Sequence, residues 1–169
     1  MSVHAARFMV EQIQKREGVV TSLIDIAELS LPVDDAGEAI KDPRFATAME
    51  QADALVIVSP EYNHSFPGLL KHVLDSCLKE YIHKAAGVVG VSAGSFGGAR
   101  MIEQFQPILR ELGLVSIFWD VNFGRIEKVF DAKGQLLDQS FIPRADKFLG
   151  ELIWMATVLR YGRENVPLK

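Results

Sequence analysis

Apolar residues in this chain follow two kinds of spacing, and each kind predicts a different backbone conformation. In several stretches they recur every three or four positions, which is typical of helices with one buried face. Between these stretches lie short apolar runs rich in valine and isoleucine, which are typical of buried strands. The spacing predicts helices over residues 3–13, 38–51, 67–78, 102–112 and 141–156, and strands over residues 19–24, 54–59, 87–92 and 114–119.

Turn-forming residues agree with most of these boundaries. Gly18 follows the first helix and Gly113 follows the fourth, at positions where glycine commonly ends a helix. Pro67 suits the first position of the third helix, whereas Pro43 lies inside the second. Before the last helix, the turn sequence Asp131–Gly134 predicts a small hairpin, whose arms are Lys128–Phe130 and Gln135–Leu137.

The order of these elements predicts the fold class. Strands that alternate with helices of this length form a mostly parallel sheet with helices on both faces, an α/β sandwich of three layers. No internal repeat, linker or low-complexity tract divides the chain, so we expect one domain over residues 1–169. Ligands of such folds bind at the carboxyl ends of the strands.

Composition and charge exclude several classes of protein. The chain is 49% hydrophobic and 24% charged, which is ordinary for a globular protein. The net charge is −4, and charged residues of both signs are spread along the chain. No basic tract favours binding to nucleic acid. No apolar run approaches the roughly 20 residues that cross a bilayer, so we expect no membrane association. The single cysteine, Cys77, favours a reducing compartment, and we expect a cytoplasmic protein.

Two loops follow predicted strands at the edge where a ligand would bind. The first, Ser59–Pro67, contains two prolines that stiffen the backbone, an aromatic ring, and hydrogen-bonding groups on Glu61 and Asn63. The second, Ser92–Gly98, contains three glycines that allow backbone N–H groups to approach a flat ligand. We expect both loops to border one rigid polar cleft. Glycine-rich turns are common in α/β folds, so the residues alone leave a purely structural role for the second loop open.

The loop sequences resemble the motifs of the NADPH-dependent FMN reductase family. The resemblance extends from about Ser2 to about Val121, and its most specific element is the Pro-Glu-Tyr-Asn block at 60–63. The matching residues are Ser59-Pro-Glu-Tyr-Asn63, Pro67-Gly-Leu-Leu-Lys71, Asp75, Lys84, Ser92-Ala-Gly94, Gly97-Gly98 and Arg100.

The resemblance implies a fold, a cofactor and a site. Members of this family have a flavodoxin-like fold and bind FMN non-covalently. They pass electrons from NAD(P)H to free flavins, quinones, azo dyes or metal oxyanions, usually as dimers or tetramers. For this chain the resemblance therefore implies an FMN-containing oxidoreductase with NAD(P)H as co-substrate, a small-molecule electron acceptor, and a homodimer or homotetramer. It places the isoalloxazine ring between two sets of residues, which are Pro60, Glu61, Tyr62 and Asn63 on one side and Ser92, Gly94, Gly97 and Gly98 on the other.

The chemistry of such an enzyme makes few demands on side chains. Flavin itself accepts the hydride and passes electrons on, while the protein supplies orientation and electrostatics. We therefore expect no catalytic acid or base. The histidines show no metal-binding spacing with one another or with carboxylates, so we also expect no metal site.

The chain departs from the family pattern at its start. The family begins with a buried strand and a glycine-serine-arginine loop that holds the FMN phosphate at the first helix. Here Met1 and Ser2 lead directly into that helix. We therefore expect the sheet to lack its first, central strand and the phosphate to lose most of its donors.

A missing central strand is costly, because each buried unpaired backbone group costs about 1–3 kcal/mol. Three explanations are open. The natural protein is longer, or the hairpin or a partner chain fills the gap, or the strand at 19–24 pairs directly beside that at 54–59. The missing loop also leaves an alternative function open, a truncated relative that does not bind FMN and serves as a non-catalytic or structural partner.

Overall fold

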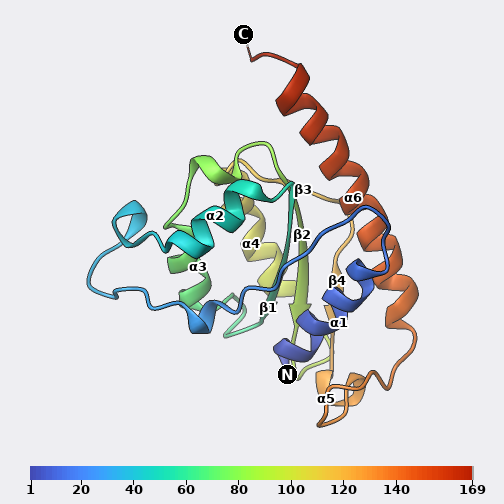
Figure 1. The fold of residues 1–169 in the computed structure, drawn as a ribbon. Helices are drawn as coiled ribbons and strands as arrows, with labels where there is room; N and C mark the ends of the chain where they lie inside the picture. The colour runs from blue at the N-terminus through green and yellow to red at the C-terminus, as the bar shows by residue number, and fades with distance from the viewer. Residues whose placement is uncertain (169) are drawn as a thin grey trace.

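The computed structural model describes residues 1–168 and arranges them in three layers (Figure 1). The middle layer is a parallel sheet in which β2 (Ala85–Val91) lies between two neighbours. On one side β2 pairs with β1 (Ala54–Pro60), and on the other with two short strands, β3 (Val115–Ser116) and β4 (Val121–Phe123). The predicted parallel α/β architecture is confirmed.

Helices cover both faces of the sheet. Core residues of α1 and α6 pack on one face, and those of α2, α3 and α4 pack on the other (Figure 1). None of the described helices combines the length and the apolar character that a membrane crossing requires. The α-helices are α1 (Ser2–Gln14), α2 (Pro43–Gln51), α3 (Gly68–Leu74), α4 (Ala99–Glu111), α5 (Ile126–Val129) and α6 (Phe141–Asn165). Short 3-10 turns are η1 (Ile26–Glu28), η2 (Gly37–Ile40) and η3 (Lys79–Tyr81).

The central strand β2 is buried along its whole length, as its unbroken apolar run predicts. Gly87 in this strand allows α6 to pack closely, since a Cβ atom there would lie 2.3 Å from the ring of Phe148. A glycine in a strand often marks such a close approach. The position of α6 on the sheet therefore depends on this residue.

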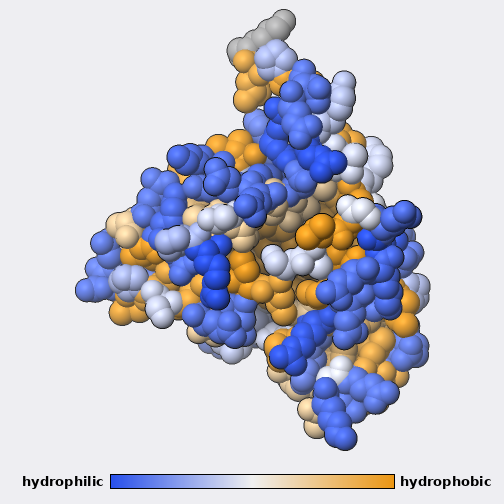
Figure 2. Space-filling view, in the orientation of Figure 1, coloured by the Kyte–Doolittle hydropathy of each residue, from blue (hydrophilic) through white to orange (hydrophobic). Residues whose placement is uncertain are grey.

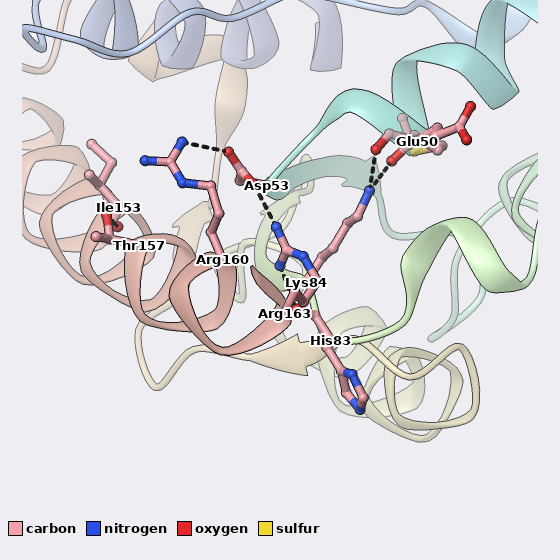
Figure 3. A network of polar contacts seen from close by, with 9 residues as sticks. Glu50, Asp53, His83, Lys84, Ile153, Thr157, Arg160 and Arg163 are labelled. Atoms are coloured by element: carbon pink, nitrogen blue, oxygen red, sulfur yellow. Dashed lines mark hydrogen bonds and ion pairs between the residues drawn. The ribbon is translucent and has the colours of Figure 1, made fainter. Parts of the chain in front are cut away.

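A polar network fixes the C-terminal half of α6 at the amino end of the sheet (Figure 3). Asp53, just before β1, accepts hydrogen bonds from Arg163 at 2.5 Å and from Arg160 at 3.1 Å. Nearby, the buried Lys84 donates from Nζ to the last turn of α2, at 2.6 Å to the Met49 oxygen and 2.7 Å to the Glu50 oxygen. Burial lowers the pKa of Lys84, with the charge of Arg163 adding to the effect. The network ties α2, α6 and the sheet together away from the carboxyl edge.

The predicted strand at 19–24 is wrong. This segment runs extended without ladder hydrogen bonds, and Val20 is 98% exposed. A strand needs a partner, and β1 pairs with β2 alone within the described residues. The explanation in which the 19–24 segment pairs directly beside β1 is therefore contradicted.

The predicted hairpin is also reduced, and it does not fill the gap beside β1. Its turn forms, because Asp131 accepts backbone bonds at 2.9 and 2.8 Å from Lys133 and Gln135. Its arms, however, share one antiparallel bridge, between Phe130 and Leu136, and α5 takes up most of the first arm. Beside β1 the surface stays open, and Figure 2 shows a hollow with apolar surface in the middle of this face.

Other predicted elements are shorter than their patterns suggest. Pro43 divides the expected helix at 38–51, because proline favours a helix start and Asp42 caps the new N-terminus with a 2.9 Å bond to the amide of Phe45. The third helix begins after Pro67 but ends at Leu74. The strand expected at 114–119 pairs with β2 over Val115 and Ser116, and the Ile117 amide donates to the Ala86 oxygen at 2.9 Å. Pairing then resumes at β4, so that residues 118–120 form a bulge.

Candidate active site

The two loops singled out in the sequence begin side by side at the carboxyl edge of the sheet. Pro60, the last residue of β1, lies opposite Val91, the last residue of β2. The amide of Glu61 then donates to the oxygen of Val91 at 2.9 Å, which extends the pairing into the first loop. The two loops therefore begin next to each other, as the expected cleft requires.

The first loop is held by a tight turn. Tyr62 and Ser65 exchange two backbone hydrogen bonds of 2.8 and 2.9 Å. The two residues between them, Asn63 and His64, have positive φ angles of 50° and 67°, as a type I′ turn requires. This turn leaves Tyr62 and Asn63 exposed. The loop thus presents polar and aromatic groups from a fixed backbone.

An ion pair connects the first loop to the helix that follows the second. Arg100, in the first turn of α4, donates from Nε to Oε1 of Glu61 at 2.7 Å, and its Nη2 also contacts this oxygen. The guanidinium lies 5.1 Å from the ring centre of Phe96. The Glu61 side chain is only 5% exposed, and its second oxygen, Oε2, is buried without a hydrogen-bond partner in the described structure. That oxygen is a buried acceptor that the described residues leave without a donor.

The three glycines of the second loop have different roles. Gly97 and Gly98 have positive φ angles of 60° and 82°, and added Cβ atoms would lie 2.6 Å from the backbone of Asn122 and 2.7 Å from that of Gly90. These two glycines are required for the loop to pack on β2 and β4. Gly94 is different, because its nearest neighbour would be the Ser92 hydroxyl at 4.0 Å. Open space lies beside Gly94.

The second loop also offers hydrogen-bond donors. From Ala93 to Gly98, no backbone N–H donates a hydrogen bond to another described residue. The loop is nevertheless held in place, since the oxygen of Gly94 accepts bonds from the Arg125 amide at 2.8 Å and the Ser92 hydroxyl at 2.9 Å. A fixed run of free donors suits a ligand with several acceptor atoms.

These groups fit the ring of FMN. An isoalloxazine edge carries carbonyl and ring-nitrogen acceptors together with one N–H donor. The free amides of the second loop match the acceptors, and Oε2 of Glu61 matches the donor. For the phosphate, the helix start of α1 lies at the same end of the molecule (Figure 1), with Ser2 as its first residue and no side-chain cap. The chain's residues would therefore hold the ring more fully than the phosphate.

One titratable group close to β4 is perturbed. Burial raises the pKa of Asp120, in the bulge before β4, to about 6, and the charge of Glu103 on α4 contributes in the same direction. No three or more metal-ligating side chains cluster in the part of the chain that the structure describes.

Sequence reasoning missed some of these features. It named Arg100 as part of the second motif but not its bond to Glu61, because a contact between two loops depends on the finished fold. It did not single out Phe96, which is exposed between the glycines. Its position in a glycine-rich loop is the one signal that could have identified it.

Comparison with known proteins agrees with the site. The family model for NADPH-dependent FMN reductase matches residues 1–127. An NAD(P)H-dependent FMN reductase of Pseudomonas aeruginosa is 33% identical over 129 residues, which cover 72% of this chain and 70% of the relative. A quinone reductase of Pseudomonas putida is 30% identical over 128 residues, covering 70% of this chain and 68% of the relative.

A solved structure confirms the flavodoxin-like α/β fold. FerB, a flavoenzyme NAD(P)H:(acceptor) oxidoreductase from Paracoccus denitrificans, has a TM-score of 0.74 at 22% identity, covering 93% of this chain and 90% of FerB. The reductases among the relatives do not favour the alternative of a non-catalytic partner protein. The chain belongs to the NADPH-dependent FMN reductase family, and it is an oxidoreductase with FMN as cofactor and NAD(P)H as co-substrate.

Proposed function

We propose that the FMN ring lies between the two turns at the carboxyl edge of β1 and β2. Its contacts would be Pro60, Glu61, Tyr62 and Asn63 on one side and Ser92, Gly94, Gly97 and Gly98 on the other. One observation carries this proposal: Oε2 of Glu61 is an acceptor without a partner, and the amides of the second loop are donors without partners. Together they complement the N–H donor and the acceptor atoms of the isoalloxazine ring. A buried acceptor without a partner is costly, and a donor on the bound ring would remove that cost for Oε2 of Glu61.

In this proposal the chain binds the FMN ring and orients it, and no side chain transfers a proton. Bound FMN supplies the hydride and electron chemistry. Arg100 holds the Glu61 carboxylate in place, so Oε2 stays directed at a ring donor. Gly94 leaves room for a flat group, while Gly97 and Gly98 fix the loop against the sheet. The exposed ring of Tyr62 borders the open side, where nicotinamide and then the acceptor would stack.

We further propose a quinone or a free flavin as the electron acceptor. The P. putida relative is named a quinone reductase, and the exposed loops suit small planar molecules. The buried thiol of Cys77 and the need for NAD(P)H support a cytoplasmic location. A homodimer or homotetramer completes the proposal.

The experiment is reconstitution of the purified chain with FMN, followed by assay with NADPH and a benzoquinone. We expect a flavin absorption spectrum that stays with the protein on gel filtration, and quinone-dependent oxidation of NADPH. Double-reciprocal plots of rate against NADPH concentration, at several fixed quinone concentrations, should give the parallel lines of a ping-pong reaction. A chain that takes up no FMN would overturn the site, and a loaded chain that reduces flavin but no quinone would overturn the acceptor.

A further inference from the structure

A recess lined by three cations lies beside the second loop. It has a volume of about 310 Å³ and opens between the end of β4 and the start of α6. Ser95 of the second loop forms part of its wall, and Arg125, Lys128 and Arg144 line it as well. Within the part of the chain that the structure describes, none of these three cations forms an ion pair. We name this space the basic recess.

The charges that line the basic recess suit a phosphate with two negative charges. Besides the three cations, the recess is lined by one carboxylate, that of Asp138, so its lining carries three positive charges and one negative charge, a net of +2. Hydrogen bonds from Ser140, one of them 3.0 Å from its amide to Oδ1, lower the pKa of Asp138, and the charge of Arg144 acts in the same direction. The Arg144 guanidinium lies 4.8 Å from the ring centre of Phe141, which supports it at the wall. A guanidinium binds phosphate oxygens through paired N–H donors.

Arg125 is held at the basic recess in a costly backbone conformation. Its φ angle is 49°, in the left-handed region that glycine adopts more easily. The turn is fixed nonetheless, because the Arg125 amide donates to the Gly94 oxygen at 2.8 Å and the Lys128 amide donates to the Arg125 oxygen at 2.7 Å. A side chain at a position where glycine would be relaxed indicates that the side chain has a role. The same turn connects the basic recess to Gly94, which borders the proposed ring site.

We propose that the basic recess binds the 2′-phosphate of NADPH, and that Arg125, Lys128 and Arg144 make the enzyme prefer NADPH to NADH. A phosphate ester of this kind carries close to two negative charges at neutral pH, which matches the lining of the recess. NADH has a hydroxyl group in its place and would leave the three cations without a partner. The inference rests on the proposed ring site, since the nicotinamide of the same molecule has to stack on the flavin.

The order of the strands places the basic recess within reach of a dinucleotide. β2 lies between β1 and β4, and the two loops follow β1 and β2, so the recess lies past the second loop. Neighbouring strands are about 4.8 Å apart, so β4 lies about 10 Å from β1. An extended dinucleotide is longer than this. With its nicotinamide over the ring between the two loops, its adenosine end can cross the second loop and enter the recess.

The phosphate of FMN has a different expected position. The start of α1 offers a helix N-terminus for it, and α1 packs against β1. The basic recess lies at β4, on the other side of β2. The two phosphates would therefore bind on opposite sides of the ring site, and a change in the recess should leave FMN binding unchanged.

The first test is the kinetics of Arg125→Gly in the FMN-loaded enzyme. Glycine adopts the φ angle of this position without strain, so the variant should fold at least as well as the wild type. We expect kcat/KM to fall about tenfold for NADPH and to stay unchanged for NADH. The matched control is His83→Gly, because His83 is also exposed and has a positive φ angle of 60° but lies before β2, at the amino end of the sheet. This variant should keep the wild-type values with both nucleotides.

The second test measures binding to the apo-protein and does not depend on the ring site. Calorimetric titration compares adenosine 2′,5′-bisphosphate with AMP, which lacks the 2′-phosphate. We expect the bisphosphate to bind at least about tenfold more tightly than AMP, and Arg144→Gln to reduce this difference. A chain that takes up no FMN but still prefers the bisphosphate would refute the ring site and support the recess.

Three other results would overturn the proposal. Equal binding of the bisphosphate and AMP would show that the recess does not recognise a 2′-phosphate. A fall in kcat/KM for NADPH and NADH alike in Arg125→Gly would mean that the recess binds the pyrophosphate that both nucleotides share. A weaker affinity of this variant for FMN would mean that the recess holds the flavin phosphate.

Discussion

Replacement of Glu61 by glutamine tests the connection between the two loops. The change keeps the shape of the side chain but removes the charge that Arg100 contacts through Nε and Nη2. A hydrogen bond to a charged group contributes about 1.5–3 kcal/mol to stability. Because the Arg100 side chain is 45% exposed, solvent screening lowers this value, and we expect a loss of about 1–2 kcal/mol.

The same variant should also bind FMN less tightly. Oε2 of Glu61 is proposed to accept a bond from the ring, and a neutral amide oxygen is a weaker acceptor than a carboxylate. We expect the dissociation constant for FMN to rise about tenfold, which corresponds to about 1.4 kcal/mol. Urea unfolding of the apo-protein measures stability, and quenching of flavin fluorescence measures affinity.

A double-mutant cycle separates the ion pair from unrelated effects. Glu61→Gln and Arg100→Gln should each destabilise the apo-protein, and the double variant should lose less than the sum, by about 1 kcal/mol. The control is Asp75→Asn, which removes an exposed pair with Lys71 on α3 and should change stability by less than about 0.5 kcal/mol. Additive losses at Glu61 and Arg100, with unchanged FMN affinity, would refute the reasoning.

Three further predictions concern the scaffold. Lys84→Met removes two hydrogen bonds to carbonyls at the end of α2, and urea unfolding should show that the free energy of unfolding falls by about 2–3 kcal/mol. An unchanged midpoint would show that those carbonyls need no partner. The pKa of Asp120 is about 6 in the folded state, against an ordinary value of 3.8. Between about pH 4 and pH 6 the folded state therefore binds more protons than the unfolded state, so stability should fall as the pH rises through this range. Screening keeps this fall to about 1 kcal/mol, and Asp120→Asn should abolish it; a slope that persists in the variant would point to another group. On β1, the amide of Ile57 points toward β2, whereas the amides of Val56 and Val58 point away from it. Hydrogen exchange should therefore be at least about tenfold faster at Val56 and Val58 than at Ile57. Equal protection at all three would mean that another strand covers this edge.

The sequence patterns predicted those elements whose stability is local or fully buried. The run at 87–92 became β2, because a strand buried on both faces needs continuous apolar residues, and the run at 54–59 became β1, which is buried on one face and half-buried on the other. The carboxyl-edge location of both loops followed from the parallel order of these strands. The positions of the two loops relative to the sheet could thus be predicted before any side-chain contact was known.

The patterns failed where an element depends on a partner elsewhere in the chain. Val19–Ile24 has the composition of a strand, but β propensity cannot supply the neighbour that a strand needs. The run at 114–119 gave no sign that Phe118 and Trp119 would leave the ladder, since an apolar residue suits a core and an interface equally. The Glu61–Arg100 pair joins residues 39 positions apart and depends on the final packing.

The central claim is that a flat ring binds beside Gly94, between the two turns. The most direct test is the FMN affinity of Gly94→Val, measured by flavin fluorescence together with the melting temperature of the apo-protein. A Cβ atom there would meet no protein atom closer than the Ser92 hydroxyl at 4.0 Å, so we expect the valine variant to fold normally while its side chain occupies the space for the ring. Gly162→Ala, on α6, is the control and should bind FMN as the wild type does. We predict at least about a hundredfold weaker FMN binding at an unchanged melting temperature, a loss of about 2.7 kcal/mol. Wild-type affinity in folded Gly94→Val would contradict the claim.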